Sequence, residues 1–252
     1  MIKKDFKDKH LKKTVITHHV KTGVPFMFTF ANALFGFLSI IKTIEGNFTA
    51  AALCIVAAVV MDGCDGRLAR YFKTTGALGS ELDSLCDAIS FCLAPAVLLY
   101  SWYLHHFDHV GLFSIALALY VCAGLLRLAR FNVLTQDQST FYVGLPSTIA
   151  AFFLAALIGY DMMLSHTLLH KLLTRRVMVG ITTFLALLMI STIQFPVFKK
   201  FSFKGFSIQF VARVVLLAAL SGWCFYNGYP VLLLLIGGYI TTAVIKGIIR
   251  FL

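Results

Sequence analysis

Long runs of apolar residues, separated by short polar segments, recur along most of this chain of 252 residues. A membrane-spanning helix needs about 20 mostly apolar residues, and several runs approach that length. The candidate spans are residues 25–42, 47–61, 84–104, 109–131, 142–163, 177–197, 209–227 and 230–249. The pattern therefore predicts an all-α polytopic membrane protein with about eight transmembrane helices, in which the second helix continues past its last apolar residue.

Composition agrees with a membrane protein, because 59% of the residues are hydrophobic and 24 are phenylalanine, well above the share in a soluble domain. The six cysteines lie in or beside apolar runs and show no CxxC spacing, so we interpret them as small buried hydrophobes rather than disulfide or zinc ligands. The net charge of +11 is attributed to membrane orientation and lipid contact, and no nucleic acid partner is expected.

Basic residues predict the orientation of the chain. Residues 1–23 hold seven lysines against two aspartates, which indicates a cytoplasmic or interfacial segment on anionic lipid; a disordered tail is the alternative. With an even number of spans, both termini and the loops holding most Arg and Lys residues lie in the cytoplasm. One loop disagrees, because Lys171, Arg175 and Arg176 fall on the outer side.

Acidic residues are rare, with only 11 in the chain, yet several gather in the stretch MDGCDGRLARYFKTTGALGSELDSLCD, residues 61–87. Asp62 and Asp65 share one helical face by their spacing, and Asp83 and Asp87 share another. Four converging carboxylates would repel one another unless a cation lay among them. Oxygen ligands of this kind suit magnesium, manganese or calcium, so the spacing predicts a divalent metal site.

Glycines and arginines lie between the two pairs of aspartates, in a predicted hairpin of seventeen residues. Gly66, Gly76 and Gly79 would let the backbone turn or approach a ligand, and Arg67 and Arg70 suit anionic oxygens. Together with a metal, these residues indicate a phosphate-containing substrate. Solvated loop charges at a membrane surface would explain the arginines, but not acids at helical spacing.

The segment DGCDGRLAR and the residues after it resemble the signature D-x2-D-G-x2-A-R-x8-G-x3-D-x3-D of the CDP-alcohol phosphotransferase family. Its fixed positions are filled by Asp62, Asp65, Gly66, Ala69, Arg70, Gly79, Asp83 and Asp87. The resemblance implies a homodimer whose catalytic core of six transmembrane helices corresponds to residues 24–197. Residues 198–252 would add two C-terminal helices.

The same resemblance implies roles for individual residues. Asp62, Asp65 and Asp83 would hold divalent metal, expected to be two ions, on the diphosphate of a CDP-linked substrate. Asp87 would lie in the same metal site and act as the base toward an alcohol. The residues expected near the nucleotide and diphosphate are Asn32, Gly66, Arg70 and Gly79; Asn32 could instead bond a neighbouring helix.

Two further stretches, RLARFN at 127–132 and GLPS at 144–147, resemble the serine-using, bacterial integral-membrane branch of the family. The implied reaction transfers a phosphatidyl group from CDP-diacylglycerol to the hydroxyl of L-serine, in the bacterial cytoplasmic membrane with the active site facing the cytoplasm. Arg127, Arg130 and Asn132 are the expected serine-binding residues. The alternative is that these arginines only anchor the cytoplasmic end of their helix, as the positive-inside rule describes, and bind no substrate.

Other functions stay open at this point. Related enzymes would use the same chemistry with glycerol phosphate, inositol, inositol phosphate or choline as the acceptor. Charged residues within membrane spans also mark transporters. The clustering of charge at one membrane edge, and the absence of a detectable repeat between the two halves of the sequence, favour an enzyme.

Overall fold

The structure of the chain is a computed structural model, and it describes residues 23, 25–72, 76–107, 111–134, 141–163, 174–196 and 237–242. The predicted basic segment, apart from its last residue, lies outside this part of the chain. So do the predicted helix at 209–227 and most of the one at 230–249.

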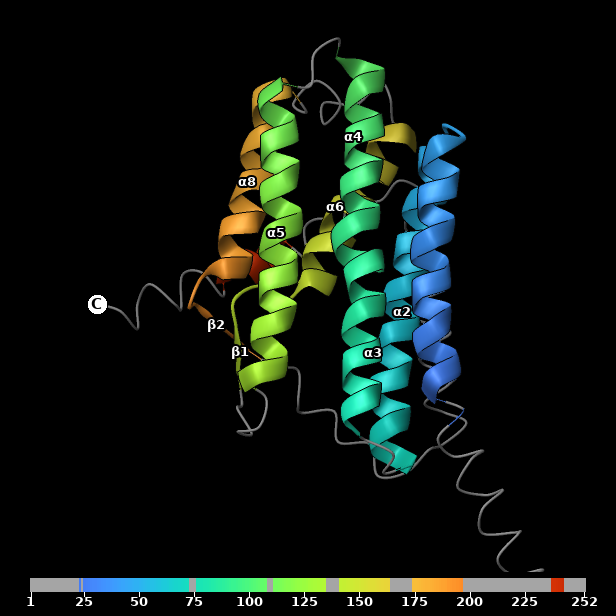
Figure 1. Cartoon of the computed structure of the whole chain (residues 1–252). Coiled ribbons are helices and arrows are strands. Elements are labelled where there is room, and N and C mark those ends of the chain that lie inside the picture. The colour runs from blue at the N-terminus through green and yellow to red at the C-terminus, as the bar shows by residue number, and fades with distance from the viewer. Residues whose placement is uncertain are drawn as a thin grey trace, which may run out of the picture.

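Helices form a bundle and stand roughly parallel to one another (Figure 1). They are a first helix Pro25–Ile44, α2 Phe48–Phe72, α3 Ala77–Asp87, the π-helical turn η1 Ala88–Leu93, α4 Ala94–His106, α5 Gly111–Leu134, α6 Ser147–Met163 and α8 Arg175–Ile190. Helical structure also covers residues 237–242. The α3, η1 and α4 segments follow one another without a break and make a single long helix.

Four helices in the described residues are long and apolar enough to cross a membrane, and they are Pro25–Ile44, Phe48–Ala69, Ala77–His106 and Gly111–Val133. A shorter apolar helix covers Ser147–Met162. Large apolar side chains such as Met27, Leu112 and Ile115 are exposed on these helices, as expected for surfaces that face lipid. The prediction of an all-α polytopic membrane protein is confirmed.

The predicted hairpin between Asp65 and Asp83 is wrong in its extent. The α2 helix continues to Phe72 and α3 begins at Ala77, so Gly66 and Gly79 lie within helices and Gly76 is the N-cap of α3. The third span was predicted to begin only at residue 84 because polar residues precede it. Two of those polar side chains have partners on neighbouring helices, since Glu81 accepts a hydrogen bond from Asn132 of α5 and Asp83 lies with Asp62 of α2.

The fifth and sixth predicted spans are shorter than expected. Residues 142–143 belong to the strand β1 Phe141–Val143 instead of a helix, and residues 194–196 form β2 Gln194–Pro196. The two strands pair antiparallel, with Tyr142 opposite Phe195. Gly144 follows β1 with a φ of 79°, and a Cβ there would collide with the carbonyl oxygen of Met189. Only glycine fits this close approach.

The core lies between the helices, and α2 packs against α6 while α5 packs against α8. Its largest fully buried side chains include Phe91, Trp102, Tyr103 and Tyr120. Asp161 is also fully buried, and its Oδ2 accepts a hydrogen bond of 3.1 Å from the Trp102 indole. The core therefore fixes the helices and satisfies a buried acid at the end of α6.

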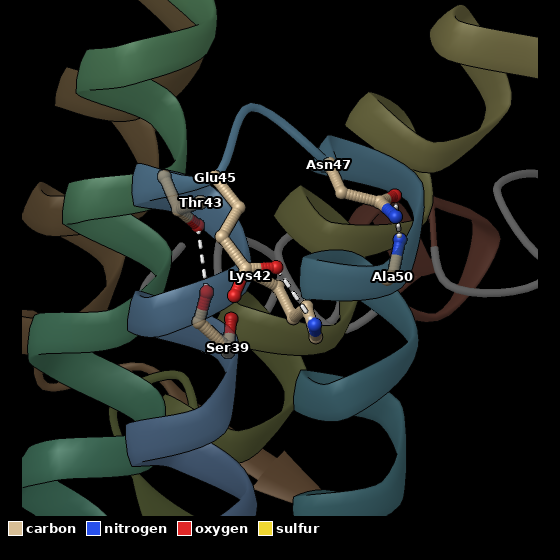
Figure 2. Close-up of polar contacts among 6 residues, drawn as sticks. All are labelled: Ser39, Lys42, Thr43, Glu45, Asn47 and Ala50. Carbon is tan, nitrogen blue, oxygen red and sulfur yellow. Dashed lines mark hydrogen bonds and ion pairs between the residues drawn. The ribbon is translucent and has the colours of Figure 1, made fainter.

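A tight turn reverses the chain between the first helix and α2 (Figure 2). Gly46 adopts a φ of 76°, typical of the residue that ends a helix. Asn47 begins α2 as its N-cap, since its Oδ1 accepts a hydrogen bond of 3.0 Å from the Ala50 amide. The side chains of Lys42 and Glu45 form an ion pair of 2.7 Å beside it. This turn places the two helices antiparallel, as short connections require.

The N-cap gives a test of this turn. Asn47→Ala should lower the free energy of unfolding by about 1 kcal/mol, because the Ala50 amide loses its acceptor. The measurement is unfolding of the purified protein in mixed detergent micelles, followed by circular dichroism. Asn47→Asp keeps an acceptor and should retain the wild-type stability. Equal stability of the alanine variant would contradict the capping role.

Candidate active site

Two helices bring the predicted aspartates together. Asp62 and Asp65 lie on α2, and Asp83 and Asp87 lie on α3. The long helix that begins with α3 packs against α2 through η1 and α4. Asp62, Asp83 and Asp87 can each offer a carboxylate oxygen such that all three oxygens lie within 4.8 Å of one another. The structure therefore brings Asp62 of the first pair together with both members of the second pair.

Charge and burial make this group suited to a cation. Asp87 is buried, Asp62 and Asp83 are half-buried, and the buried Oδ1 of Asp83 has no hydrogen-bond partner. Ionised carboxylates this close repel one another unless a proton or a cation lies among them. A set of hard oxygen donors with an unsatisfied buried oxygen fits a divalent cation.

Asp65 lies outside the closest group of three, although it is almost fully buried, with 3% of its surface exposed. Its charge acts on both Asp62 and Asp87. Asp65 therefore contributes to the negative potential of the site, and its role as a direct ligand stays a prediction.

Asn32 connects the first helix to this group. Its fully buried side chain donates a hydrogen bond of 3.0 Å from Nδ2 to Oδ1 of Asp87. The backbone carbonyl of Asn32 accepts a hydrogen bond of 2.9 Å from the Ser90 hydroxyl. The structure thus places Asn32 beside Asp87, where it orients the carboxylate. Its Oδ1 is buried without a hydrogen-bond partner.

The other residues expected near the nucleotide are less defined. Gly66 lies in α2 next to Asp65, and Gly79 lies in α3 one turn before Asp83. A Cβ on Gly79 would make an ordinary contact of 3.7 Å with the Phe26 ring. Arg70 belongs to α2, and its side chain lies outside the described part of the structure.

The two arginines of α5 take different positions. Arg127 donates a hydrogen bond of 2.7 Å from Nη1 to the hydroxyl of the fully buried Ser147 at the start of α6. Its positive charge also acts on Asp62. Arg130 instead donates from both Nη atoms to the backbone carbonyl of Ile190, at 3.1 and 3.3 Å. It therefore caps the C-terminal end of α8, where a positive charge is favourable.

Asn132 links α5 to α3. Its Nδ2 donates to Oε2 of Glu81 at 3.2 Å, and its Oδ1 accepts from the Ser84 hydroxyl at 3.0 Å. Asn132 therefore lies next to the helix of Asp83 and Asp87, but its amide is engaged with protein groups.

Two features escaped the sequence analysis. The π-helical turn η1 begins at the residue after Asp87, and such turns are frequent at functional sites. Tyr120, fully buried in α5, donates a hydrogen bond of 2.9 Å to the Phe91 carbonyl within that turn. The sequence does contain an indication of the π-helical turn, because Pro95 interrupts an apolar run that otherwise favours an α-helix.

Comparison with known proteins shows which family this chain belongs to. The sequence model of CDP-alcohol phosphatidyltransferase matches residues 22–244. A CDP-diacylglycerol--serine O-phosphatidyltransferase of Helicobacter pylori is 34% identical over 177 residues, which is 70% of this chain and 73% of that protein. The protein of the same name from Bacillus subtilis is 35% identical over 70% of this chain and 92% of its own length.

An archaeal protein is similar to the same degree. Archaetidylserine synthase of Methanothermobacter thermautotrophicus is 35% identical over 69% of this chain and 70% of its own length. The family model's span, residues 22–244, includes the aspartates, Asn32 and the α5 arginines. The chain belongs to the CDP-alcohol phosphatidyltransferase family.

Proposed function

We propose that this enzyme transfers the phosphatidyl group of CDP-diacylglycerol to the hydroxyl of L-serine, giving phosphatidylserine and CMP. The observation that supports this most is the convergence of Asp62, Asp83 and Asp87, with the positive charge of Arg127 acting on the same group. The similarity to serine-using transferases over about 70% of the chain supports serine as the acceptor.

Asp62, Asp65 and Asp83 would hold the metal, and Asp87 belongs to the same site. The carboxylate oxygens suit magnesium or manganese, with calcium as a further candidate, and two ions are proposed. When bound, the metal supplies positive charge that offsets the charge of the diphosphate.

Asp87 is the proposed base. The serine oxygen attacks the phosphorus of the phosphatidyl group, the bond from that phosphorus to the CMP oxygen breaks, and CMP leaves with the bonding electrons. The serine proton passes to Asp87. The Asn32 amide, donating to Oδ1 of Asp87 at 3.0 Å, would hold that carboxylate in place and leave Oδ2 toward the alcohol.

Arg127 is assigned to the carboxylate of serine. A guanidinium can bind a carboxylate through two parallel donors, and the hydrogen bond of Arg127 to Ser147 fixes this side chain between α5 and the start of α6. Arg130 is assigned to the end of α8, because both of its Nη atoms bond the Ile190 carbonyl. Asn132 is assigned to holding α5 against α3.

The protein is an integral membrane protein, and we propose the bacterial cytoplasmic membrane as its location. Arg67, Arg70 and Lys73 near the α2–α3 connection favour a cytoplasmic site and cytoplasmic termini, because the orientation rule counts Lys and Arg. Arg175, an exception to that bias, has its guanidinium 5.8 Å from the centre of the Phe107 ring, which gives it a structural role at the other end of the bundle. A homodimer surrounded by membrane lipids is the proposed assembly.

A CMP-release assay tests the function. Purified protein with CDP-diacylglycerol and magnesium or manganese should release CMP when serine is added, and phosphatidylserine should form in equal amount. Glycerol phosphate, inositol, inositol phosphate and choline should give little product at the same concentration. If one of these alcohols gives more product than serine, that alcohol is the acceptor. If no alcohol leads to CMP release, the transporter alternative remains.

The aspartates should divide into two groups by kinetics. Asp62→Asn, Asp65→Asn and Asp83→Asn should each reduce CMP release by at least about 100-fold in a folded protein, since a hard cation loses an anionic ligand. Asp87→Asn should lower kcat strongly while the KM for CDP-diacylglycerol changes little.

Glu45→Gln is the matched control for these substitutions. Glu45 is an exposed carboxylate at the C-terminal end of the first helix, where it pairs with Lys42. It should keep the wild-type rate. Near wild-type turnover of all three ligand variants at saturating metal would contradict the metal assignment. Equal weakening of nucleotide binding by Asp87→Asn and Asp62→Asn would make Asp87 a ligand rather than a base.

Serine selectivity should depend on Arg127. Arg127→Lys should raise the KM for serine about tenfold or more, because a charged hydrogen bond is worth about 1.5–3 kcal/mol and lysine cannot bind a carboxylate through two parallel donors. Wild-type enzyme should discriminate strongly against ethanolamine, which lacks the carboxylate, and the variant should discriminate less. Arg130→Lys should lower stability and keep the ratio of serine to ethanolamine use. A normal serine KM in the Arg127 variant would contradict the assignment.

A further inference from the structure

The helix that carries Asp87 changes its hydrogen bonding directly after that residue. In a continuous α-helix, the carbonyl of Phe91 would accept from the amide of residue 95, but residue 95 is proline. Proline has no N–H, and its ring collides with the carbonyl four residues earlier. The chain responds by widening into η1, in which the Ala94 amide donates to the Ile89 carbonyl, five residues back.

Tyr120 supplies the donor that Pro95 lacks. Its hydroxyl donates to the Phe91 carbonyl at 2.9 Å, and both Tyr120 and Phe91 are fully buried. A buried carbonyl without a donor is costly, so the hydroxyl stabilises the widened turn in one position relative to α5. No other side-chain hydrogen bond to the Phe91 carbonyl occurs among the described contacts.

Close packing fixes η1 against the helices on both sides. On the α5 side, a Cβ added to Gly124 would lie 2.5 Å from Sγ of Cys92, so α5 approaches the turn as closely as glycine allows. On the first-helix side, a Cβ on Gly36 would collide with Ser90. The turn therefore has little freedom to shift.

One face of α5 connects this turn to the proposed serine site. Tyr120, Gly124 and Arg127 are spaced four and three residues apart, so they share a face of the helix. Tyr120 and Gly124 contact η1, while the charge of Arg127 acts on Asp62. The same helix face thus sets both the turn after Asp87 and the position of Arg127.

We propose that Tyr120 is a positioning residue, which fixes Asp87 relative to Arg127 through its hydrogen bond to the Phe91 carbonyl. The proposal rests on the proposed function, because it assumes that Asp87 accepts the proton of an alcohol bound near Arg127. Tyr120 itself does not touch the substrate. Its hydroxyl keeps the proton acceptor and the acceptor alcohol at a reactive distance.

Removal of the hydroxyl tests the proposal. Tyr120→Phe keeps the ring but leaves the Phe91 carbonyl without its donor, and it should lower kcat about 10- to 100-fold, the usual effect of displacing a reacting group by about 1 Å. The KM for CDP-diacylglycerol should stay within about twofold of wild type. Rates are expressed per folded protein, as measured by size-exclusion chromatography and thermal unfolding.

Tyr103→Phe is the matched control, since Tyr103 is another buried tyrosine and lies sixteen residues beyond Asp87, about 24 Å along the helix. It should leave kcat unchanged. If Tyr120→Phe lowers stability but keeps the wild-type kcat, the hydroxyl is structural only and the proposal is overturned. An equal fall in kcat for both variants would overturn it too.

A pair of substitutions tests the same contact from the packing side. Gly124→Ala should push η1 away from α5 and lower kcat, because the new methyl group meets Cys92 Sγ. Adding Cys92→Ala removes that sulfur and should restore most of the activity, whereas Cys92→Ala alone should behave like the wild type. No rescue in the double variant would contradict positioning through η1.

The outcome for the wild type separates the two proposals. Wild-type release of CMP with serine, together with an unaffected Tyr120→Phe variant, overturns the positioning role alone. Failure of the wild type to release CMP with any alcohol contradicts the proposed function, and the role of Tyr120 falls with it.

Discussion

Mutual repulsion among carboxylates is the constraint on which the rest of this structure depends. Asp62, Asp83 and Asp87 bring oxygens within 4.8 Å of one another, and Asp65 adds a further buried charge. Inside a membrane protein such a group is stable only when positive charge and hydrogen-bond donors surround it. The neighbouring helices provide both, through the Asn32 amide and the Arg127 guanidinium.

Each helix around the aspartates meets this constraint in a different way. The first helix contributes a neutral donor, Asn32, and close packing at Gly36. The α5 helix contributes a charge at Arg127 and a hydroxyl at Tyr120. At the start of α6, the Ser147 hydroxyl accepts a hydrogen bond from Arg127. Packing and chemistry are therefore coupled, since contacts that hold the helices together also orient the groups proposed to react.

Local spacing was sufficient to predict the helices of the described residues and the convergence of Asp62, Asp83 and Asp87. Apolar runs of sufficient length mark spans, and acids three or four residues apart share a helix face. The ends of the helices near the site were predicted poorly. Polar residues before Asp83 look like a loop by composition, but they belong to α3, where Glu81 accepts a hydrogen bond from Asn132 on α5. Such tertiary contacts cannot be predicted from local patterns.

The arginines and the π-helical turn show the same limit. Arg127 and Arg130 are indistinguishable in the sequence RLARFN, yet one contacts Ser147 and the other contacts the end of α8. Their difference depends on where α6 and α8 pack. The β1–β2 pairing was likewise missed, because three-residue strands next to apolar helices leave no distinct pattern. Pro95 was visible, but its partner Tyr120 is distant in the chain.

The most direct test of the central claim is X-ray diffraction from crystals of the protein grown with manganese, with anomalous differences recorded near the manganese absorption edge. An anomalous peak should lie between α2 and α3, within coordination distance of carboxylate oxygens of Asp62 and Asp83 and next to Asp87. It should disappear in crystals of Asp83→Asn. Manganese bound only elsewhere, in protein that transfers the phosphatidyl group under the same conditions, would contradict the account.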